Sequence, residues 1–416
     1  MVKKPSSLFI QRTSMLNFIN GAGKILKAIG VDPFKIDADS IIKKTRKKAG
    51  FTGELPGQVD VGLHKMIQSI NKESKPNPFG RLAVKNLLER TLYGRFKIEQ
   101  VLAENPEIEQ AEIKQPIFII GMPRTGTSIL HAMLHEDPAH RSPLSWECLL
   151  PYPVPVPETF ANNDQLKTIT KEFDQLFKLV PDFLKKHYMA ADSPQECLAI
   201  NNLDFNSFQI SPQLYAPGYM KWFADGSGSL STMRFHKRFL QYLQSGGVKA
   251  ERWLLKSPVH LMRLDEIFEV YPDARIVMTH REPTKVVASI SSLLSSLRSL
   301  YSDHEDPART GREQMETWHH YFDRFLESRK RLNKEDQIID LHFEDFASDH
   351  IGTARKIYDK FGWELTDETI ARFQAFLAAN PRDKNGLHMY KLEDFGLTEE
   401  SVSSRFSEYI KFTNGF

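Results

Sequence analysis

Residues 117–128 read IFIIGMPRTGTS, and this stretch decides the fold. Its leading apolar run, Ile117 to Ile120, is typical of a strand that is buried on both faces of a sheet. Gly121 ends the run. A helical pattern follows, because the next apolar residues recur at helical spacing, at Ile129, Leu130, Met133 and Leu134. The stretch therefore predicts a strand, a glycine-containing loop and a helix in direct succession.

The loop 121–128 matches the nucleotide-binding pattern G-x-x-x-x-G-K-[ST] at every position except the lysine, which is Thr127. Glycines allow backbone amides to turn towards an anion, and the start of the next helix adds positive potential. The side chains of Arg124, Thr125 and Ser128 add further donors. In nucleoside triphosphatases the lysine reaches the β- and γ-phosphates beside a magnesium ion, so its replacement predicts a different anion and no required metal.

Strand and helix patterns alternate after this loop. Strands are predicted at 253–255, 275–279 and 337–341, and helices at 260–270, from Pro283 onward, at 354–361 and at 369–377. This alternation predicts an α/β fold in which a P-loop-like parallel β-sheet is flanked by helices. Ligands of such sheets bind beyond the carboxyl ends of the strands, which here are Gly121, Lys256 and the pair His280-Arg281.

The composition divides the chain into three parts. Residues 1–114 are predicted to be a mainly helical N-terminal region, and residues 115–395 an α/β domain with a helical insertion around 160–245. Residues 396–416 are predicted to be a C-terminal segment. With two cysteines, no secretory signal and no apolar run long enough to span a membrane, the sequence predicts a cytoplasmic protein.

The charge balance limits the classes of partner. Lys and Arg number 55 and Asp and Glu 53, a net charge of +2 that argues against a dedicated nucleic-acid-binding protein. A local basic pocket for a small anion remains compatible with this balance. The apolar stripe at 16–29, with lysines beside it, is compatible with contact to a membrane surface, although such a stripe is more often a packing face. The oligomeric state is left open.

Two stretches resemble PAPS-dependent sulfotransferases, where PAPS is 3′-phosphoadenosine 5′-phosphosulfate. IFIIGMPRTGTS resembles the family's 5′-phosphosulfate-binding loop, which implies a cofactor site formed by Arg124, Thr125, Gly126, Thr127 and Ser128. RIVMTHREPTKVVASISSLL at 275–294 resembles its 3′-phosphate site, an arginine after a strand with a serine eight positions later. The resemblance assigns these roles to Arg281 and Ser289.

A third, looser match is the stretch 380–386, NPRDKNG, which resembles a basic loop that closes over the same phosphate. It implies that Arg382 and Lys384 also bind the nucleotide. Together the matches resemble a broad, mostly bacterial branch of the family. Its acceptors are not implied by these motifs, so a small molecule, a sugar and a lipid all remain possible acceptors.

The resemblance implies transfer of a sulfonate group from PAPS to a hydroxyl or amine, with adenosine 3′,5′-bisphosphate as the second product. Such an in-line displacement requires neutralisation of the leaving phosphate, a role that suits Arg124 and Lys256. It also requires a base for the acceptor proton. Glu147 and His260 are the main candidates by resemblance to two branches of the family, and Glu196 is a third candidate.

Two other functions remain open from the sequence alone. A P-loop-type small-molecule kinase would need ATP and magnesium, which the missing lysine disfavours. A non-catalytic nucleotide-binding adaptor would use the helical N-terminal region as its contact surface.

Overall fold

The computed structural model describes residues 9, 10, 12–32, 34–180, 189–381 and 390–415. Its centre is a parallel sheet with the strand order β2-β3-β1-β4-β5. The strands are β1 (Ile117–Gly121), β2 (His140–Arg141), β3 (Arg252–Lys256), β4 (Arg275–His280) and β5 (Ile338–His342). The predicted parallel sheet is confirmed, and the short edge strand β2 is an addition that the sequence did not reveal.

The register of the sheet brings the predicted ligand-binding ends together. Ile119 of β1 pairs with Lys256 of β3, and Gly121 pairs with Thr279 of β4. The first loop, Lys256 and the end of β4 therefore lie along one edge of the sheet. Because β1 is the central strand, the loop that follows it lies between the ends of β3 and β4.

Alternate residues of β1 belong to different cores, as the two-residue period of a strand requires. Phe118 and Ile120 pack in a large cluster with residues of α4, α12, α14 and α15. Ile117 and Ile119 pack in a second cluster with residues of α5, α17 and α18. The sheet is thus buried on both faces, which explains the unbroken apolar run in its sequence.

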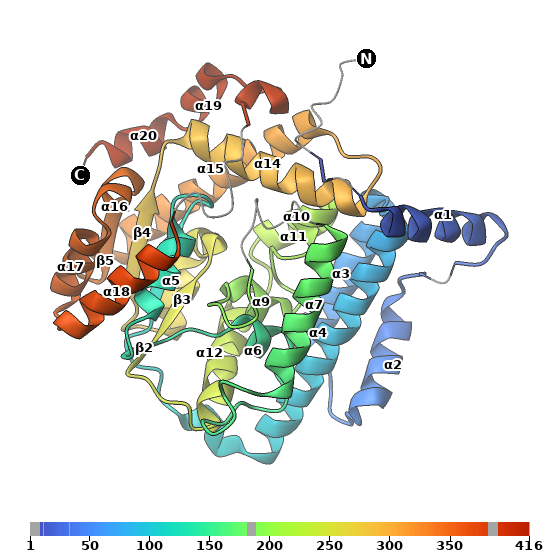
Figure 1. Ribbon diagram of the computed structural model, residues 1–416, viewed down its shortest axis with the longest axis horizontal. Helices are drawn as coiled ribbons and strands as arrows, with labels where there is room; N and C mark the ends of the chain where they lie inside the picture. Colours follow the sequence, from blue (N-terminus) through green and yellow to red (C-terminus); the bar gives the residue numbers. More distant parts are fainter. Residues whose placement is uncertain (1–8, 11, 33, 181–188, 382–389, 416) are drawn as a thin grey trace.

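The N-terminal region consists of α1 (Ser14–Ala28), α2 (Ala38–Ala49), α3 (Gly57–Ser69), the π-helical turn η1 (Ile70–Ser74) and α4 (Pro78–Glu104), followed by the turn η2 (Pro106–Gln110). Figure 1 shows these helices on the opposite side of the molecule from α16, α17 and α18. The long helix α4 begins with Pro78 in the first turn and with the Asn77 side chain accepting from the Gly80 amide at 2.8 Å.

The helices that follow β1 are α5 (Thr127–His135), α6 (Ser145–Leu149), α7 (Asp164–Leu179), α9 (Cys197–Asn202), α10 (Ser211–Leu214), α11 (Pro217–Ala224) and α12 (Ser229–Ser245). The later ones are α13 (Leu264–Val270), α14 (Pro283–Tyr301), α15 (Pro307–Leu332), α16 (Phe343–Ser348), α17 (His350–Phe361), α18 (Asp367–Ala379), α19 (Glu399–Arg405) and α20 (Ser407–Thr413), with short turns η4 (Glu335–Gln337) and η5 (Leu392–Phe395).

One predicted helix has a different form. The stretch 260–270 is not a single α-helix, because the 3-10 turn η3 (Pro258–Arg263) precedes α13. His260 therefore lies in a tight turn directly after β3, close to the ligand-binding edge. Among the described residues, no helix is both long and apolar enough to cross a membrane.

Candidate active site

The loop between β1 and α5 is built on three residues with positive φ. Gly121, Arg124 and Gly126 have φ angles of +146°, +69° and +85°. A Cβ atom on Gly121 would lie 2.5 Å from the Thr279 hydroxyl oxygen, so the loop requires glycine there. Arg124 accepts a left-handed backbone although it carries a side chain, which is a strained conformation of the kind found at functional sites.

Hydroxyl groups hold this loop in place. The Thr125 side chain is buried, donates to the Met122 carbonyl at 2.7 Å and lies 2.6 Å from the Thr279 hydroxyl of β4. Arg124 and Ser128, by contrast, are exposed. The loop therefore presents one guanidinium, one hydroxyl and the amino end of α5 to solvent, a combination suited to an anion.

The second motif meets the first loop directly. The Arg124 Nε donates to the Ser289 hydroxyl of α14 at 3.0 Å, and an Arg281 guanidinium nitrogen donates to the Arg124 carbonyl at 2.8 Å. Two stretches more than 150 residues apart thus form one polar surface. The three side chains predicted to bind both phosphate groups of a nucleotide lie within one network of contacts.

Arg281 is positioned by residues that the sequence interpretation did not identify. Its guanidinium carbon lies 4.1 Å from the centre of the Phe343 ring, just after β5. The Tyr409 hydroxyl of α20 accepts from the Arg281 amide at 3.0 Å and donates to its carbonyl at 3.1 Å. Phe343 follows the carboxyl end of a strand, and this position could have been used to predict that it lies at the ligand-binding edge of the sheet. Nothing in the sequence marked Tyr409.

Lys256 connects the loop with a carboxylate. Its side chain is buried at the end of β3, and its Nζ lies 3.2 Å from the Ser128 hydroxyl oxygen. The same ammonium forms an ion pair with Glu196, the residue that precedes α9. The Glu196 side chain is 24% exposed. Lys256 therefore places Glu196 beside the anion-binding loop.

Glu147 has a different environment. Its side chain is fully buried inside α6, where one oxygen accepts from Arg141 at 3.0 Å and the other from the Leu144 amide at 2.9 Å. Burial raises the pKa of the Glu147 carboxyl, and the neighbouring Arg141 guanidinium opposes this rise. Both oxygens are thus engaged in internal contacts that cap a helix and neutralise a buried arginine.

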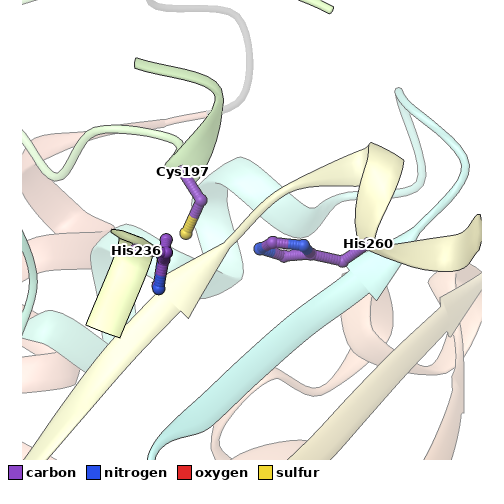
Figure 2. Close-up of side chains that lie close together, drawn as sticks. All are labelled: Cys197, His236 and His260. Atoms are coloured by element: carbon purple, nitrogen blue, oxygen red, sulfur yellow. The ribbon is translucent and has the colours of Figure 1, made fainter. Parts of the chain in front are cut away.

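His260 lies in a cluster with Cys197 and His236 (Figure 2). Burial lowers the pKa of His260 well below its usual range, and His236 and Arg263 lower it further. The imidazole is therefore neutral and enclosed. One potential ligand atom from each of these three residues lies within 4.8 Å of the others, which makes them a set that could hold a metal ion.

Comparison with known proteins identifies the family. A model of the sulfotransferase family matches residues 116–367, more than half of the chain. The chain belongs to the sulfotransferase family. The crystal structure of sulfotransferase STF9 from Mycobacterium avium is similar at a TM-score of 0.82 and 30% identity, over 90% of this chain and 96% of that one. STF1 from Mycobacterium tuberculosis H37Rv is similar at a TM-score of 0.79 and 29% identity, over 90% and 99% of the two chains.

A curated relative carries a specific activity. The sulfotransferase is 25% identical over 321 residues to Stf3 of Mycobacterium bovis, covering 76% of this chain and 77% of the relative. Stf3 is named as an omega-hydroxy-beta-dihydromenaquinone-9 sulfotransferase, and the protein from Mycobacterium tuberculosis matches equally. These likenesses confirm the predicted family and α/β fold. The chain is an enzyme that transfers a sulfonate group, so the kinase and the adaptor are set aside.

The residues of the sulfotransferase that were predicted to bind the nucleotide fall into three groups. Six of the seven on the first loop and around Arg281 lie in or beside the contacts described above: Arg124, Thr125, Gly126, Ser128, Arg281 and Ser289. The seventh, Thr127, is the buried first residue of α5. Arg382 and Lys384 lie outside the described residues.

Proposed function

We propose that this sulfotransferase takes its sulfonate group from PAPS, bound across the ends of β1 and β4. The contact of Arg124 with Ser289 carries this proposal, because it joins the loop that resembles a 5′-phosphosulfate site to the helix that resembles a 3′-phosphate site. When bound, PAPS supplies the sulfonate group and leaves as adenosine 3′,5′-bisphosphate. Arg281 and Ser289 hold the 3′-phosphate in this arrangement, and Arg382 and Lys384 add to its binding.

The loop side chains neutralise the leaving phosphate. Arg124 and Ser128 are exposed on the loop, and the Lys256 ammonium reaches Ser128. The backbone amides at the start of α5 are further hydrogen-bond donors to the anion and carry no charge themselves. We propose that these groups stabilise the charge that develops on the phosphate oxygen, so that transfer at this site requires no metal ion.

We further propose Glu196 as the general base. It is the candidate carboxylate that is both partly exposed and tied to the loop through Lys256. As the acceptor oxygen forms its bond to sulfur and the bond from sulfur to the phosphate oxygen breaks, the acceptor proton moves to the Glu196 carboxylate. Glu147 and His260 are fully buried, and both Glu147 oxygens already accept internal hydrogen bonds, which favours Glu196 over both.

The acceptor is proposed to be a hydroxyl on a long apolar molecule. This proposal is supported by the named activity of Stf3 on a hydroxylated menaquinone and by the surface of α1. The exposed apolar residues of α1 and its end share one side of the helix; they are Met15 (62%), Phe18 (75%), Ile25 (67%), Leu26 (37%) and Ile29 (69%). The helix has no acidic residue and two lysines, a pattern typical of helices that lie on anionic membranes.

Nucleotide binding tests the donor. Adenosine 3′,5′-bisphosphate should raise the melting temperature of the protein, more so as its concentration exceeds its dissociation constant, and ATP with magnesium should raise it less. Arg281→Ala should weaken the first effect, whereas Arg275→Ala, at the other end of β4, should not. Equal stabilisation by ATP would contradict the assignment of PAPS as the donor.

Labelled PAPS and purified acceptors test the substrate class. We expect transfer to hydroxylated isoprenoids in vesicles and little transfer to free sugars. Vesicles that contain anionic lipid should sediment the protein, and Phe18→Ser should reduce this binding without changing nucleotide affinity. Efficient transfer to sugars, with no vesicle binding, would refute the lipid acceptor and leave the donor site intact.

A further inference from the structure

A thiol and two imidazoles converge beneath the candidate active site. Cys197 is the first residue of α9, His236 lies in α12 and His260 lies in the turn η3 after β3. Figure 2 shows the His260 ring pointing towards the Cys197 sulfur and the His236 ring. All three side chains are buried, with exposed fractions of 1%, 0% and 0%. Three separate elements therefore deliver three potential metal ligands to one enclosed place.

Three of the four ring nitrogens in this cluster lack a hydrogen-bond partner in the part of the chain that the structure describes. Among the described residues, His236 Nε2 and both ring nitrogens of His260 are buried without a hydrogen bond. Leaving one buried polar group unsatisfied costs about 1–3 kcal/mol, so three in one cluster require an explanation. A ligand that is not part of the polypeptide would satisfy at least two of them.

The orientation of His236 matches that of a metal-binding histidine. Its Nδ1 shares a hydrogen bond of 2.8 Å with the Tyr271 hydroxyl, and this leaves the buried Nε2 as the ring nitrogen available to a metal. In metal sites the second ring nitrogen is regularly fixed by such an oxygen partner. Phe118 of β1 lies edge-on to His260, with ring centres 5.2 Å apart, and forms an apolar wall.

We propose that Cys197, His236 and His260 bind a soft d10 cation, zinc(II) or copper(I), at a closed structural site. Thiolate and imidazole are the ligands that such cations prefer. With metal–ligand bonds of about 2.0–2.3 Å, the ligand atoms of a tetrahedral site lie about 3.3–3.8 Å apart. The three atoms here lie within 4.8 Å of one another, so small side-chain rotations bring them to three of the four positions of a tetrahedral site. On binding, the Cys197 thiol releases its proton to solvent and forms the metal–sulfur bond.

A metal ion in this cluster would affect the position of two active-site residues. Cys197 directly follows Glu196, whose carboxylate pairs with the Lys256 ammonium. A cation at the cluster would join α9, α12 and η3 directly behind the Glu196–Lys256 ion pair. It would act as a positioning element for these two residues and would take no part in the transfer of the sulfonate group.

An ordered water molecule is the competing occupant, since water commonly satisfies buried polar groups. Metal analysis distinguishes the two. The protein is purified with a cleavable tag that contains no histidine, and its metal content is measured by mass spectrometry. We expect about one equivalent of zinc or copper per chain, and the ratio of the two identifies the cation.

The chain offers a matched control, because Cys148 is its other buried cysteine and is not in the cluster. Cys148→Ser should keep the metal, and Cys197→Ser and His236→Gln should each lower its content at least tenfold. Refolding the wild-type protein with cobalt(II) should give a sulfur-to-metal charge-transfer band that Cys197→Ser abolishes. If that variant does not fold, the wild-type spectrum and metal content decide alone.

The proposal is overturned by a metal content below about 0.1 equivalent in wild-type protein refolded with zinc(II) or copper(I). It is also overturned if Cys197→Ser folds and keeps the metal. Neither result depends on PAPS or on an acceptor, so failure here leaves the proposed donor site and base untouched.

Discussion

Two glutamates of this sulfotransferase look alike in the sequence and occupy opposite environments in the fold. Glu147 lies inside α6 and pairs with Arg141, whereas Glu196 precedes α9 and pairs with Lys256. The segments before the two helices are connected by a bridge between Leu144 and Pro194. The two carboxylates therefore belong to neighbouring segments and each has one cationic partner.

The difference lies in what each cation touches besides its carboxylate. Arg141 donates to the backbone carbonyl of Val248 at 2.8 Å, which is an internal structural contact. Lys256 reaches Ser128 on the anion-binding loop. A buried ion pair contributes to a unique packing, whereas a pair at the edge of a ligand site can exchange one partner for the ligand. The comparison supports the proposal that Glu147 stabilises the fold and that Glu196 is the general base.

The largest effect is expected from Glu196→Gln. Because the amide cannot take the acceptor proton, kcat should fall by about 10²–10⁴-fold. Affinity for adenosine 3′,5′-bisphosphate should change little, since Glu196 does not contact Arg281 or Ser289 in the proposed arrangement. Steady-state kinetics with the best acceptor and a nucleotide titration measure the two quantities.

Asp192→Asn supplies the control, because Asp192 is an exposed acidic residue on the same segment. It should turn over at nearly the wild-type rate. A Glu196→Gln enzyme with normal kcat would move the base elsewhere and reopen the roles of Glu147 and His260.

The second effect is on stability and concerns Glu147→Gln. Removing one partner of a buried ion pair leaves Arg141 uncompensated, and the free energy of unfolding should fall by about 3–5 kcal/mol. Urea unfolding followed by circular dichroism measures this loss. The fraction that stays folded should keep kcat within about threefold of the wild type. A stable Glu147→Gln enzyme with greatly reduced kcat would invert the comparison.

The sequence predicted the sheet better than it ranked these carboxylates. The run at 117–120 reports burial by its composition alone, because a strand covered on both faces must be apolar throughout. The loop glycines likewise predict the backbone conformation, because Gly121 and Gly126 have the positive φ angles that the pattern implies. Neither Glu147 nor Glu196 carries such a local signal, since the exposure of each side chain depends on how its segment packs against the rest of the fold.

The cluster of Cys197, His236 and His260 was beyond sequence reasoning for the same reason. Its members lie on three elements and follow no ligand spacing known for metal sites. The position of Tyr409 against Arg281 also depends on how the C-terminal helices pack. Such contacts are set by tertiary packing, which a linear pattern does not record.

The third prediction concerns binding of the 3′-phosphate and extends the comparison from carboxylate to arginine side chains. Arg281→Ala should weaken binding of adenosine 3′,5′-bisphosphate by about 10–100-fold, the usual share of a charge-assisted phosphate contact. Isothermal titration calorimetry measures the dissociation constant. Arg281→Lys should recover part of the affinity but not all, because lysine cannot form a two-point contact or stack on Phe343. An unchanged constant in the alanine variant would remove Arg281 from the site.

The smallest effect is expected from Ser289→Ala, which tests whether the two motifs share one ligand. The Ser289 hydroxyl accepts from Arg124 and is a neutral partner, so its loss should weaken nucleotide binding by only about 3–10-fold. Ser291 is the matched control, because its hydroxyl is buried on the same helix and has no partner among the described residues. Ser291→Ala should leave the affinity unchanged.

If Ser289 and Arg281 hold the same phosphate, the double variant should lose less affinity than the two single losses predict together, since neighbouring contacts to one group are not additive. Strict additivity would mean that the two residues act at separate places, and the 3′-phosphate would then rest on Arg281 alone.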